Sequence, residues 1–583
     1  MKIFSLTNFR RLTKNTNWCC ALFFAILLGF GFAWNQLVGV GRGGGPTATN
    51  SLDRTVLKID GVPVSQLEYE RAVQAQGQAV APGPPFVQAQ TAAIAQLVQN
   101  TALQELAKKY HVQVTSTDVD RYIDQLRVEA GQQKASDSAW ENFVEQNMGM
   151  TLADLRRQLA KSPQLLAQAL IAYFKRQQHI TPQDAQNQYA QVNLLTVFVP
   201  IGNSPLSPVK PGQKPLTDAE AQKLANELLA KAKAGADQKA LAKTDPRVRV
   251  VQTGFRSEYS QVPGMMSDNS PFGVLGYGKD FDAAVHATPV NGFTPIVKTN
   301  GLFSGYIFAK VLARKIALPK NFNARQAVAD LQTQKAQQQL QTELLQLINN
   351  AKIQVVDPDK QPYVDAYLLE QLQQKQIMAQ LGQPTSGPAP TKAEIDALQN
   401  KENADFEALL KHNPNDPTAA LMVAQNIEQN KLYAKGVTPA QQQAYRQQLI
   451  QLYQTALNNY EDRDLRFKLA DLYAAQKDFT DAQKQYELIA KYLAEDPPYN
   501  STTDQQYIGY YQRLANAFSA LGLPDEAKKM QQQLALVKQQ LAKDKAKEAA
   551  ANKTSSPLQG SVSLPPGGKA TVPLNTGSTA SKP

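Results

Sequence analysis

Apolar and polar residues follow different periods along the chain, and these periods separate its parts. The first part is residues 18–40, which carry no charged side chain and are rich in Leu, Phe, Ala and Gly. A helix rises about 1.5 Å per residue, so this stretch is long enough to cross a hydrocarbon core about 30 Å thick. Basic residues precede it, which favours a cytoplasmic location for residues 1–17. We therefore expect a transmembrane anchor at 18–40.

Two features of this stretch allow other interpretations. A cleaved signal peptide would have a shorter apolar core and a small-residue cleavage site, which residues 39–43 supply poorly. Cys19 and Cys20 are the only cysteines and could be acylated, although small buried residues of a helix are the simpler interpretation. Because the rest of the chain has no cysteine, it can form neither disulfides nor cysteine zinc sites.

A glycine-rich linker, residues 41–54, precedes a helical part. Residues 55–64 hold two apolar runs around an Asp-Gly pair, which predicts a short β-hairpin. Ser65 and Glu68 have the spacing of a capping box, so a helix should begin there. Helical periodicity then continues, with Thr117 as the predicted cap of a later helix.

The pattern changes over residues 191–316. Predicted elements of this stretch are strands at 194–199, 248–251 and 306–311 and a helix at 219–234, after Thr217. Helical periodicity resumes over 320–356 and ends in a strand-like segment. The expected fold class is therefore mainly α with an α+β insert: a discontinuous helical domain, residues 55–190 plus 320–356, interrupted by residues 191–316.

The C-terminal part is helical and repetitive. Residues 357–390 are predicted as a linker or helix, and residues 391–545 repeat large and small apolar positions as tetratricopeptide repeats do, which predicts an α-solenoid. Residues 546–583 end in a run rich in Ser, Pro, Gly and Thr, and we expect a disordered tail. The repeat signature consists of Leu469, Ala470, Tyr473, Ala482, Tyr486, Ala515, Phe518 and Ala527.

The net charge of +11 does not indicate nucleic-acid binding, because the basic residues are scattered among acidic ones or lie near the two ends. Anionic lipid attracts a mildly basic surface of this kind. The four histidines form no metal-ligand motif, and no phosphate-binding glycine loop occurs. We expect neither a metal nor another cofactor.

Residues 55–69, 108–120 and 148–156 form three segments that, in this order, resemble signatures of the SurA/PpiD family of extracytoplasmic chaperones and parvulin-type prolyl isomerases. The resemblance covers roughly residues 1–356, and the repeats lie beyond it. It implies a SurA-like chaperone domain. The membrane-anchored members of this family also imply an N-terminus inside and most of the chain outside.

Residues 281–284, 290–299 and 305–311 look like the second half of a parvulin domain. Parvulins commonly place one histidine in the first strand and another in the last, and the resemblance puts Thr196 and Ile307 at these positions. Cis/trans rotation about the amide bond before proline has a barrier of about 18–20 kcal/mol. An isomerase lowers this barrier by stabilising the twisted amide with polar groups in a dry pocket. Ile307 offers no hydrogen bond, so we expect a degenerate site with weak or absent isomerase activity.

The acidic or thiol residue of such a site is replaced near residues 252–254, and His286 falls on a predicted surface helix. Adaptable Met and aromatic side chains of the insert suggest a groove for unfolded peptide, with ordinary core packing as the alternative. The candidate peptide-binding residues are Met265, Met266, Phe272, Phe281 and Phe303.

The leading functional hypothesis is an ATP-independent holdase for unfolded or nascent exported polypeptides. It would be a single-pass protein of the bacterial inner membrane, with a cytoplasmic N-terminus and the bulk of the chain in the periplasm or another extracytoplasmic space. One alternative is an active peptidyl-prolyl cis-trans isomerase. Another is a scaffold whose repeats recruit an envelope or translocon protein.

Overall fold

The computed structural model describes residues 53–76, 81–204, 212–258, 275–299, 304–380, 387–498 and 501–554. The predicted anchor at 18–40 lies outside these ranges, and no helix within them is both long and apolar enough to span a membrane. The described residues are mainly helical with two small sheets, which confirms a mainly α class with an α+β part. The chain divides into two units, residues 1–423 and 424–583.

Both ends of the first unit's helical part meet in one sheet. Strand β1 (Thr55–Ile59) pairs with β2 (Val62–Ser65) through a tight turn, and with β7 (Ile353–Val355) on its other edge. Both pairings are antiparallel, with Ile59 opposite Ile353. An ion pair of 2.6 Å between Arg54 and Asp357 lies beside this sheet. Residues before and after the insert are thereby held together.

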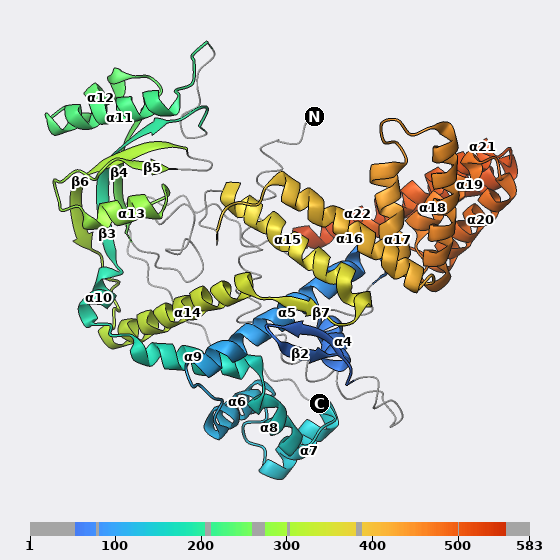
Figure 1. Ribbon diagram of the computed structural model, residues 1–583, viewed down its shortest axis with the longest axis horizontal. Helices are drawn as coiled ribbons and strands as arrows, with labels where there is room; N and C mark the ends of the chain where they lie inside the picture. The colour runs from blue at the N-terminus through green and yellow to red at the C-terminus, as the bar shows by residue number, and fades with distance from the viewer. Residues whose placement is uncertain are drawn as a thin grey trace. The chain divides into compact units, whose positions relative to one another are not determined.

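Helices from both sides of the insert share a core. Long helix α14 (Ala324–Asn350) packs against α5 (Pro84–Lys109) and α9 (Pro163–Gln177), as Figure 1 shows. Each Leu or Phe buried there contributes about 1.5–3 kcal/mol. The shared core consists of Ala102, Leu103, Leu106, Leu170, Phe174, Ala336, Leu340 and Leu344. Shorter helices α4 (Gln66–Ala75) and α10 (Pro182–Asn187) complete this part.

Helix α4 begins as its sequence predicts. The Ser65 hydroxyl accepts from the Glu68 N–H, and the Glu68 carboxylate accepts from the Ser65 N–H. The predicted cap at Thr117 is wrong, because α6 (Ser116–Glu129) is capped by Thr115. Asp118 lies three residues after Thr115 and completes a capping box there. Such caps contribute about 1 kcal/mol each.

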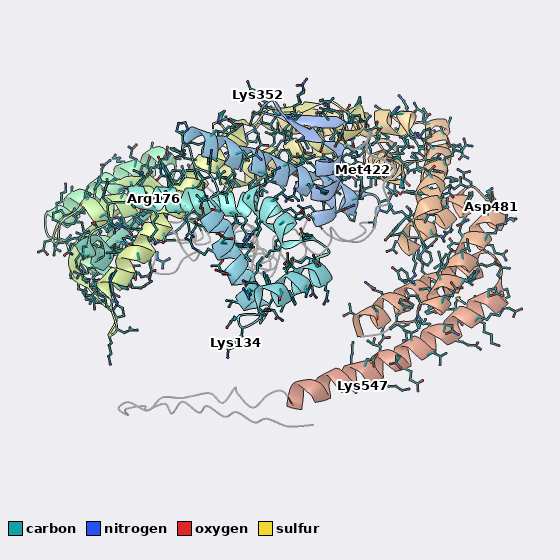
Figure 2. The ribbon with its side chains drawn as sticks, turned by 90° about the horizontal axis from the view of Figure 1, so that it is seen from below. Lys134, Arg176, Lys352, Met422, Asp481 and Lys547 are labelled. Atoms are coloured by element: carbon teal, nitrogen blue, oxygen red, sulfur yellow. The ribbon has the colours of Figure 1, made fainter. Side chains whose placement is uncertain are left out.

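Three helices form a lobe with a core of its own. They are α6, α7 (Asp137–Met148) and α8 (Leu152–Ala160), and Lys134 between the first two is labelled in Figure 2. Apolar residues recur three and four positions apart on each helix, so each presents one buried stripe. The stripes meet around Trp140, which is 2% exposed.

The insert is a four-stranded antiparallel sheet in the order β4-β3-β6-β5. Its elements are β3 (Ala190–Pro200), α11 (Asp218–Lys233), α12 (Gln238–Thr244), β4 (Arg249–Ser257), α13 (Lys279–Ala287), β5 (Val297–Thr299) and β6 (Gly305–Ile316). Thr217 caps α11 as predicted. The insert begins and ends at paired strands, with Ala190 opposite Ile316.

Alternation along β3 and β6 gives the sheet two buried faces. Val197 and Phe308 belong to the core that also contains residues of α11, whereas Phe198 and Ile307 belong to the core with α13. Gly305 is required where the strands meet, because a Cβ there would lie 2.5 Å from the Val199 carbonyl oxygen. A sheet covered on both faces leaves little apolar surface of its own exposed.

Residues 357–390, predicted as a linker or helix, contain α15 (Gln361–Gln380), which packs on α5 and on α16 (Lys392–His412). Tyr363 of α15 contacts Phe86 of α5 edge to face, with ring centroids 6.0 Å apart. Helix α17 (Pro417–Asn426) follows α16. The first unit therefore extends past residue 391, where the sequence predicts the repeats to begin.

The second unit consists of helices joined by short turns. After α17 and a π-helical turn (Ile427–Lys431) come α18 (Pro439–Asn459), α19 (Arg463–Ala475), α20 (Phe479–Glu495), α21 (Ser501–Ala520) and α22 (Pro524–Thr554). Helices α19 and α20 form one hairpin and α21 and α22 another. Asp481 in the first turn of α20 and Lys547 near the end of α22 are labelled in Figure 2. Because α22 reaches Thr554, the predicted tail boundary at 546 is too early.

We predict that Gly83→Ala lowers the stability of the first unit more than Gly131→Ala does. Both glycines have positive φ, but a Cβ on Gly83 would lie 2.9 Å from the Leu421 side chain, whereas a Cβ on Gly131 meets nothing within 4 Å. The backbone strain alone is about 1–3 kcal/mol. Urea unfolding of the two variants should show the larger loss for Gly83→Ala. Equal losses would show that the contact with Leu421 is unimportant.

Candidate functional site

The two positions expected to carry isomerase chemistry lie on adjacent strands of the insert. Thr196 is in β3 and Ile307 in β6, and both are buried. Thr196 lies opposite Ala309, and Ile307 lies opposite Phe198. Since opposed residues share a face, both positions lie on the face that packs against α13.

Neither position offers a polar group to a bound amide. The Thr196 hydroxyl donates to the Val251 carbonyl at 3.0 Å, within the sheet. Ile307 has no exposed surface and packs in an apolar core with Phe281 and Val285. Stabilising a twisted amide requires preorganised donors in a dry site. These two residues instead hold the sheet and its core together.

Of the candidate peptide-binding residues, only Phe281 lies in the part of the chain that the structure describes. Its side chain is completely buried and contacts Tyr277 edge to face, with centroids 5.4 Å apart. Phe281 therefore packs in the core, as the alternative interpretation expects. The other four, Met265, Met266, Phe272 and Phe303, lie outside the described residues.

Thr253, in the segment predicted to replace an acidic or thiol residue, has a structural contact. The Leu194 N–H donates to the Thr253 hydroxyl at 3.0 Å, where the register of β3 and β4 shifts. A bulge leaves a backbone group without its ladder partner, and this hydroxyl satisfies it. Thr253 thus stabilises the irregular pairing.

Sequence reasoning missed a polar cluster that fixes α13. Arg314 donates to the Glu258 carboxylate at 2.8 Å, and Glu258 is 3% exposed. The same guanidinium donates to the carbonyls of Val285 and Thr288, at the C-terminal end of the helix. The His286 ring, expected on a surface helix, contacts the Glu258 carbonyl oxygen at 3.0 Å. A cation at a helix C-terminus is favourable, so this cluster anchors α13 on the sheet.

The lobe of α6–α8 carries a groove of about 480 Å³. Met148, Gly149 and Met150 form one side, where α7 ends and the backbone turns through a positive φ at Gly149. Residues of α8 and the position after it form the other side: Asp154, Arg157, Gln158 and Lys161. Met148 is 1% exposed and packs in the core around Trp140, so the accessible methionine is the half-buried Met150. A methionine side chain adapts its shape to varied partners. The volume suits a few side chains of a peptide.

The polar side of this groove is partly neutralised. Asp154 pairs with Arg157 one turn away. A hydrogen bond from the Thr151 hydroxyl lowers the pKa of Asp154, so the carboxylate stays charged. Lys161 makes no ion pair among the described residues. The groove therefore combines an adaptable apolar side with amide and cationic donors.

A second groove, of about 450 Å³, lies in the second unit at the ends of α19 and α20. Its lining has five carboxylates, three tyrosines and one arginine: Glu461, Asp462, Asp464, Glu495, Asp496, Tyr460, Tyr492, Tyr510 and Arg463. The arginine is occupied by Asp496 at 2.6 Å, and this contact lowers the pKa of that carboxyl. The chain as a whole has a net charge of +11, whereas the lining of this groove is acidic.

The repeat signature residues are all buried in the second unit, at 8% exposure or less. Tyr473 accepts from the Gln454 amide at 2.6 Å, and Tyr486 donates to Asp471 at 2.6 Å. These residues hold the hairpins together and line neither of the two grooves. In the described part of the chain no group of three or more His, Cys, Asp or Glu side chains is arranged to hold a metal ion.

Residues 6–171 match the family model described as SurA-like N-terminal domain. Two solved structures of foldase protein PrsA are each 12% identical to this chain. The one from Lactococcus lactis covers 54% of this chain and 99% of its own, with a TM-score of 0.19. The one from Streptococcus pneumoniae covers 50% and 91%, with a TM-score of 0.15. Curated proteins gave no match. The N-terminal part of the chain is thus similar to the SurA-like domain of chaperones.

Proposed function

We propose that this protein is a membrane-anchored, ATP-independent chaperone that binds unfolded exported polypeptides outside the cytoplasm. The observation that carries the proposal is the match of residues 6–171 to the SurA-like N-terminal domain. The lobe of α6–α8, with its methionine-lined groove, belongs to this region. A holdase needs adaptable apolar surface and no reactive side chain, which is what this groove offers.

The proposed location is the bacterial inner membrane, with residues 18–40 as a single anchor and the units from residue 55 onward on the periplasmic side. The apolar length of that stretch and the basic residues before it support this topology. Tethering would raise the local concentration of the chaperone where clients emerge, without new contacts.

We also propose that the insert is a parvulin-like domain with weak or no isomerase activity. The sequence resemblance of residues 281–311 supports its kinship. Burial of Ile307 and the commitment of the Thr196 hydroxyl to Val251 support the loss of activity. The insert then acts as a rigid part of the chaperone.

The holdase prediction is tested with the whole chain in lipid nanodiscs, mixed at equimolar ratio with a thermally unfolded model protein. Light scattering should fall relative to empty nanodiscs. Met150→Asp should weaken this suppression several-fold, because a charge in the groove must be desolvated by an apolar client. Ala153→Asp places the same charge on an exposed position of α8 outside the groove and should act like the unmodified chain. No suppression by the unmodified chain would overturn the proposed function.

The isomerase alternative is tested with a protease-free assay on an X-Pro peptide. We expect the full chain to give the uncatalysed rate, since Ile307 has no donor and the Thr196 hydroxyl is occupied. Thr196→Val should leave that rate unchanged. A catalysed rate that Thr196→Val abolishes would show that this face of the sheet is an active site.

A scaffold role for the second unit is favoured by one observation, its acidic, tyrosine-lined groove. We propose that this unit is a tetratricopeptide-like solenoid, whose stacked hairpins offer concave surfaces to peptides. Carboxylates and aromatic faces both attract cationic side chains, so the partner would present Lys or Arg.

Fluorescence anisotropy with a labelled Lys/Arg-rich peptide tests this role. Binding to the full chain should weaken several-fold in Asp464→Asn combined with Glu495→Gln, and in high salt. Glu487→Gln, on an exposed part of α20 away from the groove, is the matched control. Equal binding by both variants would place the peptide elsewhere.

A further inference from the structure

Ionisable side chains are buried where α15 packs on α16. Asp365 of α15 is 2% exposed and Glu402 of α16 is 4% exposed. Asp405 lies one turn beyond Glu402, and the more exposed Glu370 lies further along α15. We call these four carboxyl groups, together with Lys401, the acidic seam.

A single cation serves the acidic seam. The Lys401 ammonium contacts Asp365 at 2.5 Å and Asp405 at 2.9 Å. The Glu402 carboxyl instead accepts from the Gln399 amide at 2.7 Å. One lysine cannot neutralise four carboxylates, and an ionised carboxylate is disfavoured away from water.

The titration of the seam follows from this geometry. Burial raises the pKa of Glu402 to about 7, and the nearby Asp365 and Glu370 add to the effect. Burial and the hydrogen bond with Asp405 raise the pKa of Asp365. Against the effect of burial, hydrogen bonds with Asp365 and Lys401 lower the pKa of Asp405. Asp365 is therefore the member of this pair that takes up a proton first as the pH falls.

The other ionisable groups that face the acidic seam do not change the direction in which its stability depends on pH. Burial raises the pKa of Glu370, whose carboxylate accepts from the Thr91 hydroxyl of α5 at 3.2 Å. Although burial opposes it, hydrogen bonds with the two aspartates raise the pKa of Lys401, which stays charged. Burial raises the pKa of Tyr367 to about 12, so this side chain stays neutral.

Helix α15 also connects the seam to the helical core. Tyr363 contacts Phe406 of α16, with centroids 5.7 Å apart, and Phe86 of α5 on its other side. The N–H of Gly83, just before α5, donates to the Thr418 hydroxyl of α17 at 3.2 Å. Tyr363 thus places α15 in contact with both α16 and α5.

We propose that the acidic seam is a pH-sensitive latch: α15 holds α16 firmly when the buried carboxyl groups of Glu402 and Asp365 carry protons, and releases it as they ionise. The pKa values of these acids are higher in the folded state than in the unfolded state. Their protonated forms therefore stabilise the fold fully below the unfolded-state pKa values, and this stabilisation is lost as the pH rises. For Glu402 this stabilisation is lost between about pH 4.5 and pH 7. The latch is independent of the proposed chaperone function.

Hydrogen exchange of the full chain at several pH values, with exchange times scaled for intrinsic rates, tests the latch. Protection of residues 361–380 and 392–412 should fall about tenfold or more from pH 5.5 to pH 8, while residues 463–495 should show no such fall. In Glu402→Gln, the amide mimics the protonated acid, so the fall should be much smaller. Asp396→Asn removes a carboxylate from an exposed position of α16 and should behave as the unmodified chain.

Two results would overturn the latch. The first is protection of α15 and α16 in the unmodified chain that does not change with pH, a measurement that needs no variant. The second is a Glu402→Gln variant with the same pH dependence as the unmodified chain, or one that unfolds. Either outcome leaves the aggregation and isomerase assays untouched, so failure of the latch is distinguishable from failure of the proposed function.

Discussion

The pairing of β7 with β1 is the constraint on which the first unit depends. It closes the long loop between residues 59 and 353, since Ile353 lies opposite Ile59. Closure entropy grows only with the logarithm of loop length, about 0.6 kcal/mol for each doubling, so even this long loop is tolerated. The insert adds little strain, because its own ends are paired at Ala190 and Ile316. Apolar packing of α14 against α5 and α9 then supplies the stabilisation that three residues of β7 alone could not.

The same closure positions everything that follows β7. Because β7 ends beside β1, the chain continues directly into α15 against α5, and α16 adds to α15. The insert is held by different means. Ile307 fills the core under α13, and Arg314 ties the end of that helix to Glu258. Positions that could have carried chemistry, Thr196 and Ile307, serve the sheet and its core instead.

Local signals in the sequence predicted local structure well. Ser65 with Glu68, and Thr217, each mark a helix start that the structure has. The wrong cap at Thr117 shows the limit, because Thr115, Ser116 and Thr117 all suit a cap. Thr115 and Thr117 each have an aspartate three residues later, Asp118 and Asp120, so spacing alone does not decide between them. The structure uses Thr115 with Asp118.

Long-range contacts were beyond the reach of these patterns. Glu258 and Arg314 are 56 residues apart, and no pattern in either segment indicates that their side chains pair. The sequence predicts residues 357–390 only as a linker or helix, because α15 packs against both α5 and α16. Its buried residues Tyr363, Val364, Ala366, Tyr367 and Leu369 form no single stripe. Amphipathic periodicity detects helices with one buried and one solvent-exposed face, so it does not identify a helix that packs between two others. The candidate grooves were missed for a similar reason, since each joins residues of different helices: the end of α7 with α8 in the first, and the start of α19 with the end of α20 in the second.

The acidic seam adds an energetic argument to this architecture. Replacing a buried ionisable cluster by apolar residues of similar volume is often neutral or stabilising, so Asp365 and Glu402 are not there for stability at neutral pH. Rings of Tyr363, Phe86 and Phe406 contribute the apolar burial that holds the helices together despite them. The contact between α15 and α16 is stable when these acids are neutral and weaker when they ionise. A change of pH therefore shifts it between two states. An apolar contact of the same size would not respond to pH, because it has no group that ionises.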